Sequence, residues 1–186
     1  MANTDLRYQR TERRLLQAFG EAMEEKPLDK ITVTALSAAA EINKATFYLH
    51  YRDIYELAAA YARAIAAQRV GAMDYLSCFF EDPRTFAARL VADFEARKDE
   101  AVRFEENGLM RFYLDAFADA LHAHLRKLKP VVDDGRSAMM IMFVLHGTLS
   151  LLPRYGNETQ TAADVAGEAL TALNCYGEAR HAGRSA

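Results

Sequence analysis

The stretch from Thr32 to Leu57 constrains the fold more than any other part of this sequence. It contains two short segments with helical spacing of apolar residues, 33–40 and 43–51, which are separated by a tight break. A third helical pattern begins at Asp53, a residue type that favours the N-cap position. Two short helices around a tight break, followed by a longer helix, predict a helix-turn-helix.

The rest of the chain also shows helical periodicity, and no segment shows the alternation typical of strands. We expect further helices at 10–26, 53–75, 82–98, 109–128, 135–152 and 161–176. The last of these should turn Val165, Ala169, Leu170 and Leu173 inward, and the polar tail from Gly177 should fray. The sequence therefore predicts an all-α protein. An N-terminal three-helix domain with the helix-turn-helix would cover residues 1–56, and a helical domain would cover 57–186.

Composition and motifs exclude several classes of protein. The net charge of −3 does not suit a non-specific nucleic-acid binder, although a local basic patch would suffice for a specific one. The longest apolar run, 138–145, is too short to span a membrane, and the start lacks an apolar signal region, so we expect a cytoplasmic protein. No glycine-rich phosphate loop, nucleophile motif or metal-ligand spacing occurs, so we expect no enzyme, metal or cofactor. His122 and His124 are two positions apart, which directs them to different sides of a helix.

The helix-turn-helix residues divide into an apolar underside and an outer face. The expected underside is Val33, Leu36, Ala40, Ile42, Phe47 and Tyr51. Asn43 suits the N-cap of the second helix, whose first N–H groups, with Lys44, suit a phosphate. Lys44 can donate to guanine, Ala45 can contact a thymine methyl group, and Thr46 can contact a base or a phosphate. Tyr48, Leu49 and His50 also remain for the groove side, although Tyr48 could instead be packed against the protein.

The same stretch resembles the DNA-binding domain of the tetracycline-repressor (TetR) family of bacterial regulators. The resemblance rests on Thr32, Leu36, Ser37, Ala40, Glu41, Ile42, Asn43, Lys44, Ala45, Thr46, Phe47, Tyr48, Leu49, His50, Tyr51 and Leu57, together with Phe19 in the first helix, and covers roughly residues 8–65. It implies groove contacts by Lys44, Ala45, Thr46 and Tyr48. It also implies phosphate contacts by Thr32 or Thr34, by Tyr48 and by His50.

The sequence departs from the family pattern at two positions. Glu41 stands where the family usually has a turn glycine, and a left-handed non-glycine residue costs about 1–2 kcal/mol. Either the turn stores this strain or its geometry differs. Ile54 stands where the family usually has a lysine that contacts phosphate, and Arg52 is a possible substitute. An N-terminal cluster of Arg7, Arg10, Arg13 and Arg14 could contact phosphate or could simply be a solvated helix face.

The resemblance further implies a ligand-responsive repressor that binds a palindromic DNA operator as a homodimer and is released by a small-molecule effector. Dimerisation would use the last two helices, and the apolar segment 138–152 and the small residues Ala162, Ala163, Ala166 and Gly167 favour it independently. The candidate effector-binding residues are Phe86, Phe94, Phe112, Tyr113, Phe117, His122, Met142 and His146, any of which could equally be core. The alternative is a co-regulator with the same fold that contacts another protein and binds no operator.

Overall fold

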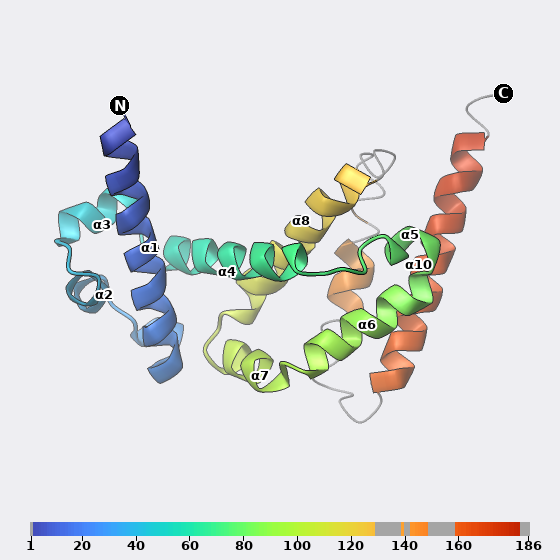
Figure 1. Cartoon of the computed structure of the whole chain (residues 1–186). Coiled ribbons are helices and arrows are strands. Elements are labelled where there is room, and N and C mark those ends of the chain that lie inside the picture. The colour runs from blue at the N-terminus through green and yellow to red at the C-terminus, as the bar shows by residue number, and fades with distance from the viewer. Residues whose placement is uncertain (1, 129–138, 140–141, 149–158, 183–186) are drawn as a thin grey trace. The chain divides into compact units, whose positions relative to one another are not determined.

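A computed structural model of the chain describes residues 2–128, 139, 142–148 and 159–182 (Figure 1). The described residues form helices and turns and include no strand, which confirms the predicted all-α class. The helices are α1 (Ala2–Glu25), the short 3-10 helix η1 (Leu28–Lys30), α2 (Val33–Ala39), α3 (Lys44–His50), α4 (Ile54–Gly71), α5 (Cys78–Glu81), α6 (Pro83–Glu95), α7 (Lys98–Glu106), α8 (Met110–Leu128) and α10 (Thr159–Ala182). Residues 142–148 are also helical.

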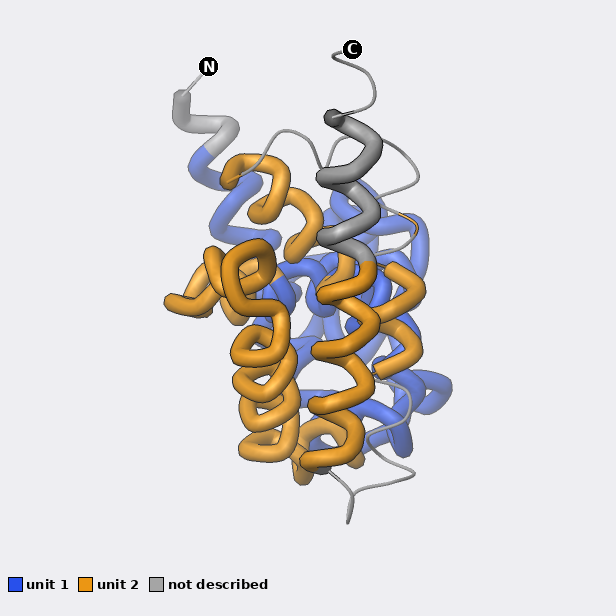
Figure 2. Tube along the Cα trace, turned by 90° about the vertical axis from the view of Figure 1, so that its right-hand side faces the viewer, with its two compact units in different colours: residues 1–66, 103–116 blue, residues 67–102, 117–186 orange. Residues whose placement is uncertain are grey.

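The chain divides into two compact units (Figure 2). Unit 1 comprises Met1–Ala66 and Arg103–Ala116, and unit 2 comprises Ala67–Val102 and Phe117–Ala186. Unit 1 therefore includes a stretch from the middle of the sequence that its N-terminal motifs gave no reason to expect. The boundary between residues 56 and 57 stays a prediction about where independent domains begin and end.

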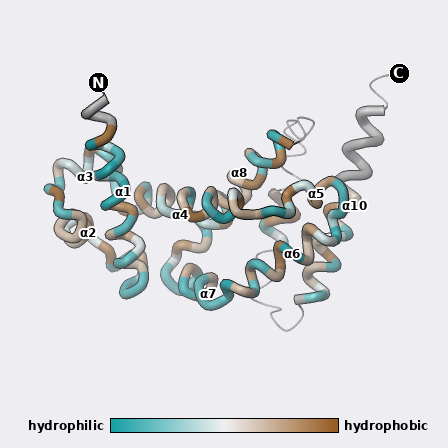
Figure 3. The backbone as a smooth tube through the Cα atoms, viewed as in Figure 1, coloured by the Kyte–Doolittle hydropathy of each residue, from teal (hydrophilic) through white to brown (hydrophobic). Residues whose placement is uncertain are grey.

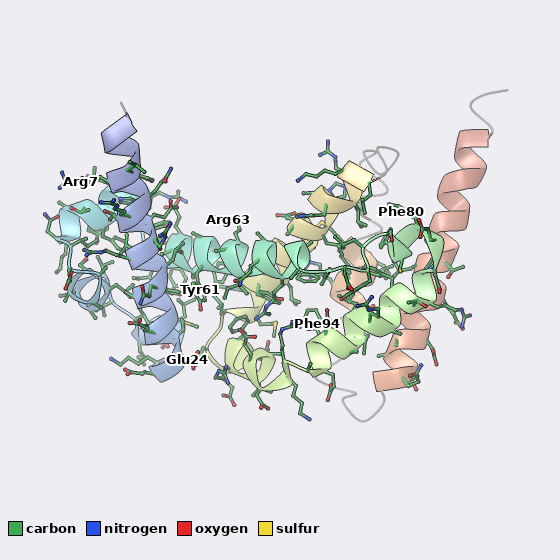
Figure 4. The ribbon with its side chains drawn as sticks, in the orientation of Figure 1. Arg7, Glu24, Tyr61, Arg63, Phe80 and Phe94 are labelled. Atoms are coloured by element: carbon green, nitrogen blue, oxygen red, sulfur yellow. The ribbon has the colours of Figure 1, made fainter. Side chains whose placement is uncertain are left out.

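The core of unit 1 forms around one stripe of α1. Leu15, Phe19 and Met23 are buried at helical spacing on this stripe. The ring of Phe19 meets the ring of Tyr61 from α4 edge to face, with centroids 5.2 Å apart. Gly20 permits this contact, because a Cβ atom at that position would lie 2.9 Å from the Tyr61 hydroxyl oxygen. Figure 4 shows Tyr61 beside α1. A glycine in α1 thus sets how closely the first turns of α4 approach it.

Asn107 joins the second stretch of unit 1 to the end of α1. Its side-chain amide donates to the carbonyl of Met23 at 2.7 Å, and its own carbonyl accepts from the backbone N–H of Leu28 at 3.1 Å. Gly108, with a φ of 75°, then ends α7 in the left-handed conformation that glycine adopts without steric cost. The hydrophilic helix α7 buries Phe104 near its end, where the ring meets Tyr113 of α8 (Figure 3).

Unit 2 contains a close packing of α6 against α10 (Figures 1 and 2). Asp82 caps α6 by accepting from the backbone N–H of Thr85 at 3.1 Å, and Pro83 occupies the first turn, as the sequence predicts. A Cβ atom on Gly167 of α10 would lie 3.0 Å from the Cα atom of Arg84. The small residues of α10 therefore bring it close to a helix of the same chain.

The structure corrects several sequence-based expectations. Helix α1 begins at Ala2 rather than at residue 10, α4 ends at Gly71 rather than near residue 75, and α10 continues to Ala182 beyond the expected end. The expected helix at 82–98 is α6, which ends at Glu95, and a separate helix that the sequence did not predict, α7, begins at Lys98. Val165, expected to face inward, is 56% exposed. The expected helix at 135–152 lies largely outside the described residues. No helix in the described ranges is long and apolar enough to span a membrane.

Candidate nucleic-acid interface

The turn between α2 and α3 has a non-glycine residue in a left-handed conformation. Glu41 has a φ of 54°, and its backbone N–H donates to Ala38 while that of Ile42 donates to the carbonyl of Ser37 at 2.9 Å. This pair of hydrogen bonds is the Schellman motif, whose left-handed position usually belongs to glycine. The sequence left two alternatives for this turn, and the structure retains the left-handed geometry with its strain.

The negative charge of the Glu41 side chain is paired with a positive charge, because Arg14 lies beside it. One oxygen of the Glu41 carboxylate lies 3.4 Å from the guanidinium of Arg14 in α1. Both side chains are more than half exposed, so water screens the pair and its contribution to stability is small. The pair nevertheless offsets a negative charge at the turn that precedes α3.

Side-chain caps fix where both short helices begin. The hydroxyl oxygen of Thr32 accepts from the N–H of Ala35 at 3.2 Å and caps α2. Asn43 caps α3, as predicted, and its Oδ1 atom accepts from the backbone N–H of Thr46 at 2.7 Å and from the Thr46 hydroxyl at 2.9 Å. The hydroxyl proton of Thr32 stays available for a phosphate. The Thr46 hydroxyl already donates to Asn43 and can still accept a hydrogen bond.

Helix α3 has a buried side and an exposed side. Phe47 is fully buried, while Lys44, Ala45, Tyr48 and Leu49 are exposed. The pairs 44/48 and 45/49 are each separated by four positions, so these residues form one continuous outer face. Tyr48 is 57% exposed although the edge of its ring contacts Phe47 at a centroid distance of 5.5 Å. Its hydroxyl can therefore reach a partner outside the chain.

His50 lies apart from this outer face and packs on α1. Its imidazole stacks on the ring of Tyr8, with centroids 3.9 Å apart and planes inclined by 21°. Burial lowers the pKa of His50, and the carboxylate of Glu12 offsets only part of this effect. His50 is therefore neutral at pH 7. The neighbouring Tyr51 hydroxyl donates to Glu12 at 3.3 Å, so α1 holds the end of α3 through two side chains.

The other candidate phosphate ligands lie on the surface around α3. Thr34 is exposed on α2, and Figure 4 shows Arg7 on the part of α1 next to α3. The side chain of Arg52 is 86% exposed, and only its Nε atom is engaged, at 3.1 Å from a Glu56 carboxylate oxygen. Its terminal nitrogens can reach a phosphate, whereas Ile54 offers no hydrogen-bond donor. The predicted substitution of Arg52 for the missing lysine is compatible with this geometry.

The candidate effector-binding residues do not all lie in one unit. Phe112 and Tyr113 belong to unit 1, and Phe86, Phe94, Phe117, His122, Met142 and His146 belong to unit 2. Phe86 and Phe117 are almost fully buried. Phe86 meets Phe79 edge to face at a centroid distance of 5.2 Å, and Phe94 meets Phe117 in the same way at 5.5 Å. Among the described residues, no group of three His, Cys, Asp or Glu side chains could hold a metal ion.

Tyr8 is the residue near α3 that the sequence interpretation missed. The segment before residue 10 has few apolar residues, so its periodicity gave no sign of a helix. One signal was available, because Tyr8 lies seven positions before Leu15 and thus continues the stripe of Leu15 and Phe19. Leu49 was assigned to the groove side without a specific contact, and its 77% exposure makes it the most exposed large apolar side chain of α3.

Comparison with known proteins gives limited guidance. No protein-family model matches the chain, and no curated protein matches it. One similar solved structure is a protein of Mesorhizobium loti MAFF303099 assigned to the TetR family of transcriptional regulators. It is 16% identical, with 91% of this chain and 98% of that chain covered and a TM-score of 0.46. Likeness at this level supports no functional conclusion.

Proposed function

We propose that this chain is a transcriptional regulator that binds a palindromic DNA operator as a homodimer, with α2 and α3 as its helix-turn-helix. The observation that carries the proposal is the two-sided structure of α3. Phe47 anchors the helix in the core, while Lys44, Ala45 and Tyr48 are exposed on its outer face. A helix of this kind suits the major groove, where side chains at the start of the second helix contact base edges.

The phosphate contacts of this proposal come from the surroundings of α3. Thr32, Thr34 and Arg52 supply hydrogen-bond donors, and the neutral imidazole of His50 supplies at most one N–H. Lys44 and Arg52 contribute positive charge at the two ends of the helix. This local charge compensates for the overall net charge of −3. The protein would act in the cytoplasm, with the DNA-binding domain at 1–56 and the sensing and dimerisation domain at 57–186.

The proposed homodimer forms through the last two helices, but the observation that supports it differs from the one that the sequence offered. The small residues of α10 pack against α6 of the same chain, so they no longer argue for a second copy. Apolar side chains that stay exposed supply the support instead. Met139 is 72%, Phe143 81% and Val165 56% exposed. A second copy of the chain would cover such surface and present two copies of α3 to two half-sites.

A small-molecule effector would release the repressor by favouring one of two conformations. Its binding site would include aromatic and polar residues of the 57–186 domain, taken within one unit from the candidates Phe112 and Tyr113 of unit 1 or Phe86, Phe94, Phe117, His122, Met142 and His146 of unit 2. An effector shifts such an equilibrium only as far as its affinities for the two conformations differ. The 57–186 domain, rather than α3, would therefore determine how the protein responds to the effector.

The test is a fluorescence titration of the dimer with duplexes enriched from a random library by the protein itself. We expect a sequence-preferring complex that weakens as salt rises, because cations on the protein displace counterions from phosphates. Lys44→Ala and Tyr48→Ala should each abolish the preference without changing the oligomeric state. Enrichment of no sequence would contradict the proposal and favour the co-regulator, for which the exposed carboxylate of Glu41 at the turn is the supporting observation.

A further inference from the structure

Leu49 is exposed to an extent that the fold does not explain. Its side chain is 77% exposed, more than that of its neighbour Tyr48 at 57%. A single exposed leucine is ordinary on a protein surface and by itself indicates nothing. The position of Leu49 on α3 makes it informative, because the outer face of this helix is the part of the chain that the proposed function uses.

The outer face of α3 combines a cationic edge with an apolar edge. Ala45 and Leu49 are four positions apart, so their side chains lie one above the other, and Lys44 and Tyr48 form the parallel row. All four are exposed. Ala45 and Leu49 thus form a narrow apolar strip, and no described residue of the chain covers Leu49.

The charges around this strip suit a polyanion. Lys44 is exposed at the start of α3, and the guanidinium of Arg52, 86% exposed, follows its end. A protein partner would need a wider apolar patch than this strip to bind stably. In the major groove of DNA, the one apolar group that a base presents is the C5 methyl group of thymine. An exposed leucine flanked by cations therefore fits the major groove of DNA better than a protein partner. In that groove Leu49 would contact a thymine methyl group.

We propose that Leu49 is a specificity-determining residue whose side chain contacts a thymine methyl group, so that each operator half-site contains an A·T pair at one fixed position. The inference rests on the proposed function, because it requires α3 to lie in the major groove. It adds a defined base preference and a defined contact to that function. Tyr48 and Lys44 would supply the polar contacts beside it.

The experiment uses the full-length protein and a duplex enriched from a random library. Each thymine of the half-site is replaced in turn by deoxyuridine, which removes the methyl group and keeps every hydrogen-bonding atom. We expect one replacement to weaken binding by the wild-type protein roughly threefold to fivefold, as the loss of one buried methyl group does. Leu49→Ala should bind more weakly and should lose its sensitivity to that same replacement. Val102→Ala, which shortens a 52% exposed side chain in α7, serves as the matched control and should behave as wild type.

The outcomes separate the inference from the function on which it rests. If no replacement by deoxyuridine weakens the wild-type complex, or if Leu49→Ala keeps the full sensitivity, the Leu49 contact is overturned while operator binding stands. If the wild-type protein enriches no sequence at all, the operator-binding function fails and the inference fails with it. Circular dichroism of Leu49→Ala should match the wild type, since an exposed side chain contributes little to folding.

Discussion

The imidazole of His50 lies flat on the ring of Tyr8, with centroids 3.9 Å apart. This stack connects the end of α3 to the first turns of α1, and Tyr51 strengthens the connection through its hydrogen bond to Glu12. Because burial lowers the pKa of His50, the neutral form of the ring predominates at pH 7. The stack thus indicates that His50 orients α3, whereas in the proposed complex Lys44 would supply charge to the DNA.

The two residues should therefore differ in how they affect the salt dependence of DNA binding. Lys44→Ala removes a cation, so the slope of the logarithm of affinity against the logarithm of salt concentration should fall by about 1. His50→Gln removes a neutral ring, so affinity should drop through loss of orientation while the slope stays that of the wild type. The measurement is a salt series at pH 7.5 for the three proteins. An equal change of slope in both variants would mean that His50 is charged in the complex.

The helix-turn-helix could be predicted almost to the residue because its signals are local. Thr32, Asn43 and Asp53 each cap a helix through their own side chain, and each of these hydrogen bonds is present in the structure. For the turn at Glu41 the sequence left two alternatives, and the positive φ decides between them. Side-chain exposure on α3 also followed, since Phe47 marks the buried side. What the motif could not supply was the partner of His50, which lies more than forty positions earlier in the chain.

The second half was harder to predict because long-range packing decides it. On α10 the prediction that Leu170 faces inward is confirmed and the same prediction for Val165 is wrong, while the small residues Ala163, Ala166 and Gly167 are also buried. The small residues indicate that some helix approaches closely, but nothing near them in the sequence indicates that this helix is α6 of the same chain. Helix α7 was missed because it is mostly hydrophilic and buries only Phe104 near its end. The buried side of α10 and the position of α7 both depend on which helices pack against them, and the periodicity of a sequence does not identify these helices.

Replacing Glu41 by glycine should stabilise the fold. Its φ of 54° costs an L-residue about 1 kcal/mol or more, whereas Gly108 ends α7 in the same motif without this cost. We expect Glu41→Gly to raise the free energy of unfolding by about 1 kcal/mol, less the entropy that glycine gains in the unfolded chain. The measurement is urea unfolding followed by circular dichroism. Glu41→Ala is the control, because it also loses the exposed pair with Arg14 but keeps the strain. Equal stability of the two variants would show that the turn is unstrained.

Replacing Gly167 by alanine should destabilise unit 2. The new Cβ atom would lie 3.0 Å from the Cα atom of Arg84, and a backbone atom cannot turn aside as a flexible side chain can. Separating α6 from α10 should cost about 1–3 kcal/mol, the usual range for an overfilled core. Gly71→Ala at the end of α4 is the matched control, because a Cβ atom there meets no described residue within 4 Å. It should be neutral or slightly stabilising through helix propensity. The measurement is the midpoint temperature of thermal unfolding for both variants. Similar midpoints would contradict the close contact between α6 and α10.

Tyr75 should make the protein sensitive to alkaline pH. Its hydroxyl donates to the carboxylate of Asp93 at 2.6 Å, and burial, followed by this hydrogen bond, raises the pKa of Tyr75 far above its ordinary value of 10.0. The folded state therefore holds the phenol proton more tightly than the unfolded state. This contribution to stability is fully present below pH 10 and is lost as the pH rises above it.

Tyr75→Phe should accordingly reduce the loss of stability above pH 10. At pH 7 the variant should be less stable by about 1–2 kcal/mol, because the Asp93 carboxylate loses its hydrogen bond. The measurement is the free energy of unfolding in urea at pH values from 8 to 11 for the wild type and the variant. Some alkaline slope should remain, since burial and the Glu12 carboxylate also raise the pKa of Tyr51. Parallel curves for the two proteins across this range would mean that Tyr75 titrates normally and that its hydrogen bond to Asp93 does not persist in solution.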